Sequence, residues 1–240
     1  MTFKKANYPC FKLAIVCLFS IVLFNSFCSN AQYTKDELLG KIHPASSNSF
    51  ALIPKEYCKN SDIYLRIEAL EAFLILRQLA EDEGINLVVI SGTRSFNHQK
   101  SIWDRKWGQT KYMGWQEIDK ARDILTYSSM PGTSRHHWGT DIDFNSLENS
   151  YFDSGDGLKV YEFLKRCGEE LGFKQVYTSK KGGRTGYEEE KWHWSYMPTS
   201  SVMLEKYNKL VSIQDLGGFN GSQVADSLQI IDNFVNGIAK

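Results

Sequence analysis

Residues 133–144, TSRHHWGTDIDF, gather side chains that bind metals in a chain with only five histidines. His136, His137, Asp141 and Asp143 all fall within this segment. Imidazole nitrogens and carboxylate oxygens are zinc ligands, and a catalytic zinc usually takes three protein ligands and leaves one position for water. The segment is therefore either a charged surface turn or part of a metal site whose remaining ligand lies elsewhere.

The alternation of apolar and acidic residues in TDIDF predicts a strand over residues 140–144. Successive side chains of a strand point to opposite faces, so the two apolar residues would face the core and the two aspartates a cleft. Gly139 allows the backbone to bend just before this strand. His136, in the preceding turn, could then meet one of the aspartates.

A second segment, EEEKWHWSY at residues 188–196, offers a further ligand. Its aromatic residues occupy alternate positions, which predicts a strand with an aromatic core face and with His193 on the opposite face. Glu190 precedes this histidine by three residues and could serve as general base and then general acid beside a metal site. The alternative for Glu190 is a charged loop, because Glu188 and Glu189 come just before it.

The remaining periodicities place these segments in a mixed fold. Ser61 and Gly84 would begin and end the first helix, and Ser95 would cap the second. Helices are expected over 62–83, 95–107, near 116–125 and over 157–171, and strands over 85–92, 140–144, 173–178 and 190–196. Apolar residues after position 200 indicate further helical segments packed on the main body. Because no regular βαβ rhythm is present, the pattern favours the α+β class.

Composition excludes some classes of protein and fits others. Hydrophobic residues make up 42% of the chain and charged residues 23%, which is typical of a globular protein. The formal net charge is zero, which argues against a nucleic-acid partner.

The first 31 residues have the pattern of a secretory signal peptide. A basic start is followed by the apolar run LAIVCLFSIVLF and by small residues at Ser29 and Ala31. The run is shorter than the about 20 residues that span a membrane. We expect cleavage near Ala31, an exported protein and no membrane span in the mature chain. The alternatives are an uncleaved anchor and, less favoured by the sequence, a lipoprotein attached through Cys28.

Cleavage would leave two cysteines, Cys58 and Cys167. An exported pair can form a disulfide. Two cysteines provide no spacing pattern to test, so a disulfide and two separate buried thiols both stay open.

Three blocks of this sequence resemble the VanY-like zinc D-alanyl-D-alanine carboxypeptidases, which share the hedgehog/DD-peptidase fold. The first is SGTRS, residues 91–95, followed by Gln99. The second is the Ser-x-His, Gly and Asp pattern, and the third is Glu-x-x-His with Trp before the histidine. The second and third blocks are formed by Ser134, His136, Gly139 and Asp143 and by Glu190, Trp192 and His193.

The resemblance implies a role for each matching residue. His136, Asp143 and His193 would bind Zn²⁺, and Glu190 would activate the attacking water. Arg94 would hold the terminal carboxylate of the substrate, a pairing that suits a bidentate guanidinium; the alternative is a salt bridge that holds the strand-to-helix turn. Ser134 would line the same pocket, and Gln99 would contact the substrate or support a residue that does.

The resemblance also implies an overall organisation and a function. The fold would be a single α+β domain, with a small, mainly antiparallel sheet flanked by helices. A zinc peptidase domain would cover 32–199, with its motifs within 85–198, and a C-terminal helical extension would cover 200–240. The protein would remove the C-terminal D-alanine of peptidoglycan stem peptides. The alternatives are a lysin-type endopeptidase on the same fold and a non-catalytic cell-wall binding module.

The sequence departs from the family pattern beside the ligands. Arg135 and His137 flank the first histidine, where Glu and Gln are common, and Asp141 stands at a position that is often small and apolar. We expect His137 to be either exposed or a support for a ligand, and Asp141 to be solvated or hydrogen bonded. Serine-based D,D-peptidase chemistry is excluded, because no serine has a lysine three residues later.

Overall fold

The strand predicted over residues 140–144 is β4 (Asp141–Phe144), an inner strand of a four-stranded sheet in the order β3-β4-β6-β5. All neighbouring strands in this sheet are antiparallel. A separate two-stranded antiparallel sheet pairs β1 with β2. The fold is that of the predicted α+β class.

The computed structural model describes residues 33–59 and 62–239. The predicted signal peptide and Ser61 lie outside the described residues. The strands are β1 (Phe50–Leu52), β2 (Tyr64–Arg66), β3 (Val89–Ser91), β4, β5 (Phe173–Gln175) and β6 (His193–Tyr196). The α-helices are α2 (Lys35–Leu38), α3 (Ile67–Asp82), α4 (Phe96–Trp107), α5 (Glu117–Ile124), α6 (Gly155–Phe163) and α7 (Met197–Leu210).

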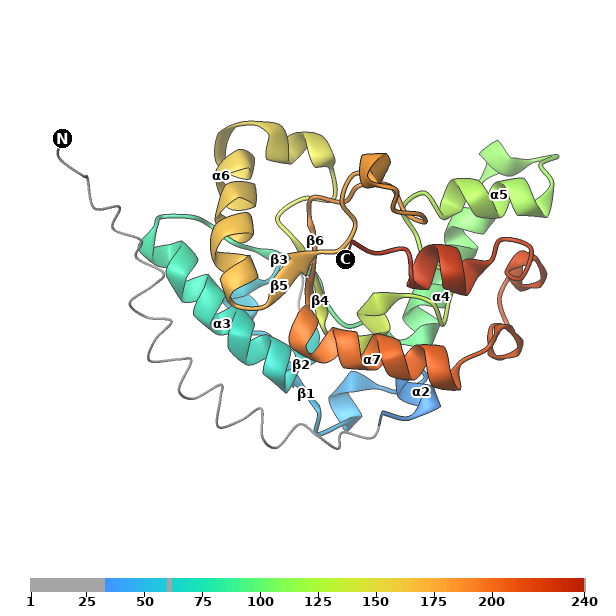
Figure 1. The fold of residues 1–240 in the computed structure, drawn as a ribbon, viewed down its shortest axis with the longest axis horizontal. Helices are drawn as coiled ribbons and strands as arrows, with labels where there is room; N and C mark the ends of the chain where they lie inside the picture. Colours follow the sequence, from blue (N-terminus) through green and yellow to red (C-terminus); the bar gives the residue numbers. More distant parts are fainter. Residues whose placement is uncertain (1–32, 60–61, 240) are drawn as a thin grey trace. The chain divides into compact units, whose positions relative to one another are not determined.

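The main sheet has one apolar face and one polar face, as the alternating residues of β4 and β6 predict. On the apolar face, Phe144 stacks on Phe73 of α3, and Trp194 contacts Tyr161 of α6. In Figure 1, α3 and α6 lie on one side of the sheet and α4 and α5 on the other. The polar face thus looks toward the part of the molecule that carries SGTRS and α4.

Several predicted elements have different bounds, and the strands predicted over 173–178 and 190–196 are shortened to β5 and β6. The helix predicted over 62–83 begins at Ile67, because Tyr64–Arg66 form β2 and pair with β1. Local apolar periodicity carries no information about a partner strand that lies elsewhere in the sequence. The strand predicted over 85–92 is reduced to β3, whose ends Val89 and Ser91 are the residues that pair with β4.

Two helical predictions also need correction. The helix predicted over 157–171 begins at Gly155, and α6 passes into a π-helical turn at Leu164–Gly168. After residue 200, α7 is the only α-helix in the described chain, and it already begins at Met197. The C-terminal segment beyond it contains short 3₁₀ and π turns and packs on the main body, with Phe234 against Tyr187.

The structure also bears on the predicted helix cap at Ser95, the two cysteines, membrane spans and the domain boundary. Ser95 caps α4 by accepting a hydrogen bond from the backbone N–H of His98, as predicted. Cys58 and Cys167 do not form a disulfide with each other. Among the described residues, no helix is both long and apolar enough to cross a membrane. The predicted domain boundary after residue 199 falls inside α7.

Candidate metal centre

The pairing of β4 with β6 brings two of the three predicted ligands together. Asp143 lies directly opposite His193, and Asp141 directly opposite Ser195. Directly opposed residues on one face of an antiparallel pair have Cβ atoms about 4.5–5.5 Å apart. The Asp143 Oδ1 atom lies 3.0 Å from His193 Nδ1, and both side chains are buried.

His136 reaches the same point from the 3₁₀ turn Arg135–Trp138. The turn ends at Gly139, whose φ of 73° is in the left-handed region; a Cβ there would lie 2.4 Å from the Phe50 ring. His136 donates from Nδ1 to the Gly92 carbonyl at 2.8 Å, which leaves the Nε2 lone pair directed at Asp143 Oδ2, 3.3 Å away. Burial, followed by the nearby Arg94 guanidinium, lowers the pKa of His136, so the imidazole is neutral and able to act as a ligand.

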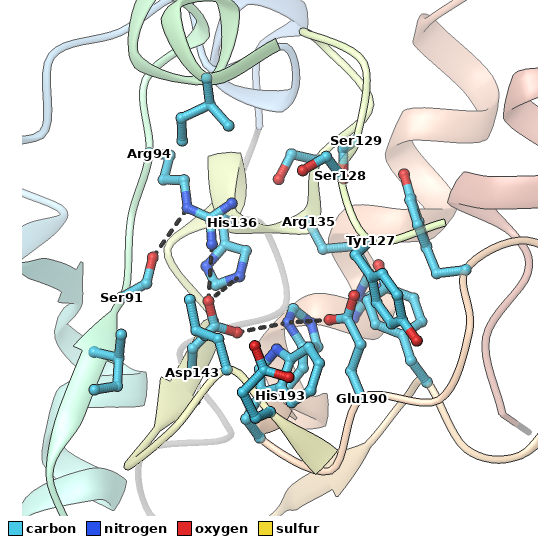
Figure 2. A pocket seen from close by; sticks show the side chains of 18 of the residues that line it. Ser91, Arg94, Tyr127, Ser128, Ser129, Arg135, His136, Asp143, Glu190 and His193 are labelled. Atoms are coloured by element: carbon cyan, nitrogen blue, oxygen red, sulfur yellow. Dashed lines mark hydrogen bonds and ion pairs between the residues drawn. The ribbon is translucent and has the colours of Figure 1, made fainter. Parts of the chain in front are cut away.

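Ligand atoms of His136, Asp143 and His193 all lie within 4.8 Å of one another, and this group could hold a metal ion. The donor set of two imidazoles and one carboxylate fits a catalytic zinc site. Each of the three side chains also has a second partner that orients it. The partner is the Gly92 carbonyl for His136, Arg94 for Asp143 and Asp141 for His193. Figure 2 shows the three converging at one end of a cavity.

Asp141 orients His193 from the side away from the centre. Its Oδ2 accepts a hydrogen bond from His193 Nε2 at 2.8 Å, which directs Nδ1 toward Asp143. Burial opposes the charged imidazolium, but the hydrogen bonds to the two aspartates outweigh it and raise the pKa of His193 to about 9. A metal cation at the centre would take the place of the Nδ1 proton.

Asp141 is itself held in a fully buried network. Its carboxylate accepts hydrogen bonds from Arg135 Nε at 3.1 Å and from the hydroxyls of Thr140 and Ser195, both at 2.7 Å. Although burial favours the neutral acid, Arg135 and His193 hold the pKa of Asp141 well below its usual range. The sequence predicts that Asp141 is either solvated or hydrogen bonded; it is hydrogen bonded and fully buried. The signal that could have assigned it is the Asp-x-Asp alternation, which puts both aspartates on the face of His193.

Glu190 lies beside the three clustered side chains at the end of the loop before β6. Its Oε2 is 3.8 Å from His193 Nδ1, and its backbone N–H donates to the Tyr177 carbonyl. Burial raises the pKa of the Glu190 carboxyl to about 8, and the neighbouring imidazole of His193 partly opposes this shift. A cation at the centre would favour the ionised form of Glu190. The Glu190 carboxyl therefore lies beside the cluster, and its charge depends on whether a cation is bound there.

Arg94 projects into the cavity from the turn between β3 and α4. It donates to Asp143 Oδ2 at 2.8 Å, to Ser91 Oγ at 2.9 Å and to Gln99 Oε1 at 3.2 Å. Gln99 is fully buried and also donates to the Ser129 carbonyl. Gln99 thus supports Arg94, one of the two roles expected for it.

His137 is buried, so the expectation that it could be exposed is wrong. Its Nδ1 donates to the Arg94 carbonyl at 2.7 Å, and its Nε2 accepts from the Gly132 N–H at 3.0 Å. Burial lowers the pKa of His137 to about 4, which keeps the ring neutral with one donor and one acceptor. The ring holds the backbone at Arg94 and Gly132 and is not part of the three-residue cluster.

Ser134 also lines the cavity, which has a volume of about 820 Å³. Its side chain is buried, and within the part of the chain that the structure describes its Oγ has no hydrogen-bond partner. An unpaired buried hydroxyl is costly. It is therefore available to a substrate group in the cavity.

Comparison with known proteins places the chain in a family. The family model VanY, described as D-alanyl-D-alanine carboxypeptidase, matches residues 62–199. The chain belongs to the VanY family. This confirms the resemblance inferred from the three motif blocks, all of which lie within the matched region.

Curated relatives of this VanY-family chain are found in two bacteria. A D-alanyl-D-alanine carboxypeptidase of Enterococcus faecalis is 30% identical over 118 residues, covering 49% of this chain and 42% of the relative. The Bacillus subtilis protein YodJ is 29% identical over 153 residues, covering 61% of this chain and 51% of the relative. The chain thus matches about half the length of these relatives.

Solved structures show the same fold. VanYB in complex with D-alanine-D-alanine superposes with a TM-score of 0.52 at 24% identity, covering 70% of this chain and 87% of VanYB. The LD-carboxypeptidase LdcB superposes with a TM-score of 0.53 at 24% identity, covering 72% of this chain and 77% of LdcB. The predicted hedgehog/DD-peptidase fold is therefore confirmed.

The position of Asp141 leads to a first prediction. Asp141→Asn is expected to weaken zinc binding about 10- to 100-fold, because a carboxylate that orients a metal-binding histidine also raises its basicity. Competition with a chromogenic chelator measures the affinity. The variant also leaves Arg135 buried without its anion, a loss expected to cost about 3–5 kcal/mol of stability.

A double variant separates these two effects. Arg135→Gln combined with Asp141→Asn should recover part of the lost stability in thermal melting and keep the weakened zinc affinity. Zinc affinity equal to wild type in the single variant would show that Asp141 does not act through His193.

Proposed function

We propose that this protein is an exported zinc carboxypeptidase that hydrolyses the C-terminal D-alanine amide bond of peptidoglycan stem peptides. The observation that carries the proposal is the convergence of His136, Asp143 and His193 with Glu190 beside them and Arg94 in the same cavity. Membership of the VanY family supports the reaction type. The predicted signal peptide and the location of the cell-wall substrate support export.

His136, Asp143 and His193 would hold the metal. Zinc suits this set, because three His and carboxylate ligands leave one position open in a tetrahedral site. When bound, zinc supplies a Lewis acid that acidifies water and polarises the scissile carbonyl. The cavity beside the three side chains gives a peptide access to this position.

Glu190 would carry the proton through the reaction. As a carboxylate it accepts a proton from the attacking water, and as the acid it gives the proton to the leaving amine. Burial raises the pKa of this carboxyl, and a bound cation would oppose that shift and favour the carboxylate that accepts the proton.

Arg94 and Ser134 would bind the end of the substrate, and Gln99 would support Arg94. The planar guanidinium of Arg94 can hold a terminal carboxylate through two parallel hydrogen bonds. Gln99 keeps the guanidinium in place from the buried side, and the unpaired Ser134 hydroxyl offers a further hydrogen bond. The requirement for a free carboxylate at Arg94 would make the enzyme an exopeptidase.

Product analysis tests this proposal. The purified protein, supplied with zinc, is incubated with a muramyl pentapeptide that ends in D-Ala-D-Ala. We expect a tetrapeptide lighter by one alanine residue, together with free D-alanine detected by a D-amino-acid oxidase assay. Cleavage within the peptide or within a cross-bridge, without release of D-alanine, would contradict the proposal and indicate the lysin-type endopeptidase. Binding without any hydrolysis would indicate the non-catalytic module.

A further inference from the structure

The cavity extends well beyond the cluster of Glu190 and the three proposed ligands. Cavities of about 300–1,000 Å³ enclose ligands the size of drug molecules, and this one measures about 820 Å³. It therefore has room for parts of a substrate other than the two residues that flank a scissile bond. One wall of the cavity is formed by residues of α4.

The α4 wall is cationic. The residues of α4 that line the cavity are His98, Ile102, Arg105 and Lys106, which recur at helical spacing and so share one face. With Arg94, which precedes the helix, this face carries three permanent or near-permanent positive charges. We call Arg105 and Lys106 together the cationic pair.

The cationic pair has no anionic partner in the described chain. Arg105 makes no ion pair or side-chain hydrogen bond within residues 33–59 and 62–239. The Lys106 ammonium donates to the Ser128 hydroxyl at 2.6 Å and forms no ion pair with a carboxylate among these described residues. Burial lowers the pKa of Lys106, the neighbouring charges of Arg105 and Arg94 lower it further, and the carboxylate of Glu190 partly opposes this shift. The repulsion between Arg105 and the half-buried Lys106 is offset only in part by Glu190, and an anionic ligand would reduce it further.

A second hollow continues from this wall. It has a volume of about 370 Å³ and shares Lys106 and Tyr127 with the main cavity. Its other charged residues neutralise each other, because Lys111 pairs with Asp123 at 2.9 Å. Lys106 is thus the charge left without a partner where the two hollows meet. Tyr127, half exposed and 6.1 Å from the Trp192 ring, gives this junction an aromatic side.

We propose that Arg105 and Lys106 form a binding subsite for a second carboxylate of the substrate, distinct from the C-terminal carboxylate at Arg94. The inference rests on the proposed function, since it assigns an acidic peptide to the same cavity. The carboxylate belongs either to an acidic residue upstream of the scissile bond or to the side chain of the leaving residue. Both sources present the same chemistry to a guanidinium and an ammonium group.

Paired peptides that differ in one charge test the subsite. The upstream pair is acetyl-L-Ala-γ-D-Glu-L-Lys-D-Ala-D-Ala and its D-isoglutamine counterpart, in which an amide replaces the free carboxylate. The leaving-residue pair is acetyl-L-Lys-D-Ala-D-Asp and the corresponding D-Asn peptide. Binding is measured by calorimetry on zinc-loaded Glu190→Gln protein, so that cleavage does not interfere.

We expect the carboxylate member of one pair to bind about 10-fold more tightly than its amide, a difference that falls with added salt. The pair that shows the difference identifies the source of the carboxylate. The double variant Arg105→Gln/Lys106→Gln should abolish the preference for the carboxylate peptide. Each single substitution should reduce this preference. Lys159→Gln, on the exposed surface of α6, is the matched control and should keep the preference.

The subsite is overturned if neither pair shows a charge preference, if neither member binds, or if the double variant keeps the preference. Hydrolysis of the same peptides by the wild-type protein reports separately on the proposed function. A charge preference in binding without hydrolysis by wild type would support the subsite and contradict the carboxypeptidase proposal. If the wild-type protein released the terminal residue from both members of a pair, and the two members bound equally well, the carboxypeptidase proposal would be supported and the subsite contradicted.

Discussion

Glu190→Gln is expected to retain zinc and to hydrolyse D-alanyl-D-alanine peptides about 10³-fold more slowly than wild type. The amide keeps the shape of the side chain but can neither accept a proton from water nor return one to the leaving amine. Zinc should stay bound, because the proposed ligands are His136, Asp143 and His193 and each keeps its own orienting partner. Single-turnover kinetics and metal analysis on the same sample measure the two properties together.

Glu188→Gln is the matched control for this variant. Glu188 is a neighbouring carboxylate in the same loop, but it lies on the surface and pairs with Lys180 at 2.7 Å. Its substitution removes one negative charge near the cavity and should leave turnover within about twofold of wild type. If Glu190→Gln kept more than a tenth of the wild-type rate, or lost its zinc, Glu190 would not have the proposed role.

Two of the three proposed ligands could be placed from the sequence because they lie on two strands with strict alternation, whereas the roles of the other site residues were implied by the family resemblance. In β4 and β6 the apolar residues mark the core face, so Asp143 and His193 must share the other face. Register determines whether two such residues meet, and a one-residue slip would move every side chain to the opposite face. The residues alone do not predict the register of β4 against β6. The family motifs indicate which residues of the two strands meet.

What the sequence did not reveal depends on contacts between distant segments. The residues of β2 fall within the helix predicted over 62–83, because a local apolar pattern contains no information about pairing with β1. The sequence leaves open whether Asp141 is solvated or hydrogen bonded, because its partners Arg135 and Ser195 become neighbours only after the turn at Gly139 and the pairing with β6. His137 has the residue type of a ligand, yet backbone groups of Arg94 and Gly132 take both of its nitrogens.

His136→Ala is expected to lose zinc at micromolar concentrations and to lose activity with it. The substitution removes one of three ligands, so the fall in zinc affinity should exceed the about 10- to 100-fold expected for the orienting residue Asp141. Isothermal titration with zinc and activity at saturating zinc measure the two losses. His43→Ala is the control, because His43 is exposed and lies outside the three-residue cluster, and it should leave zinc binding unchanged.

The order of these affinities distinguishes a ligand from a residue that positions one. Removal of the His136 imidazole takes a donor atom from the centre, whereas Asp141→Asn leaves all three donors in place and changes only the orientation and basicity of His193. Zinc at high concentration should therefore restore turnover to Asp141→Asn and fail to restore it to His136→Ala. If excess zinc rescued both variants equally, the metal would not depend on His136, and the convergence of two imidazoles and a carboxylate would be structural rather than catalytic.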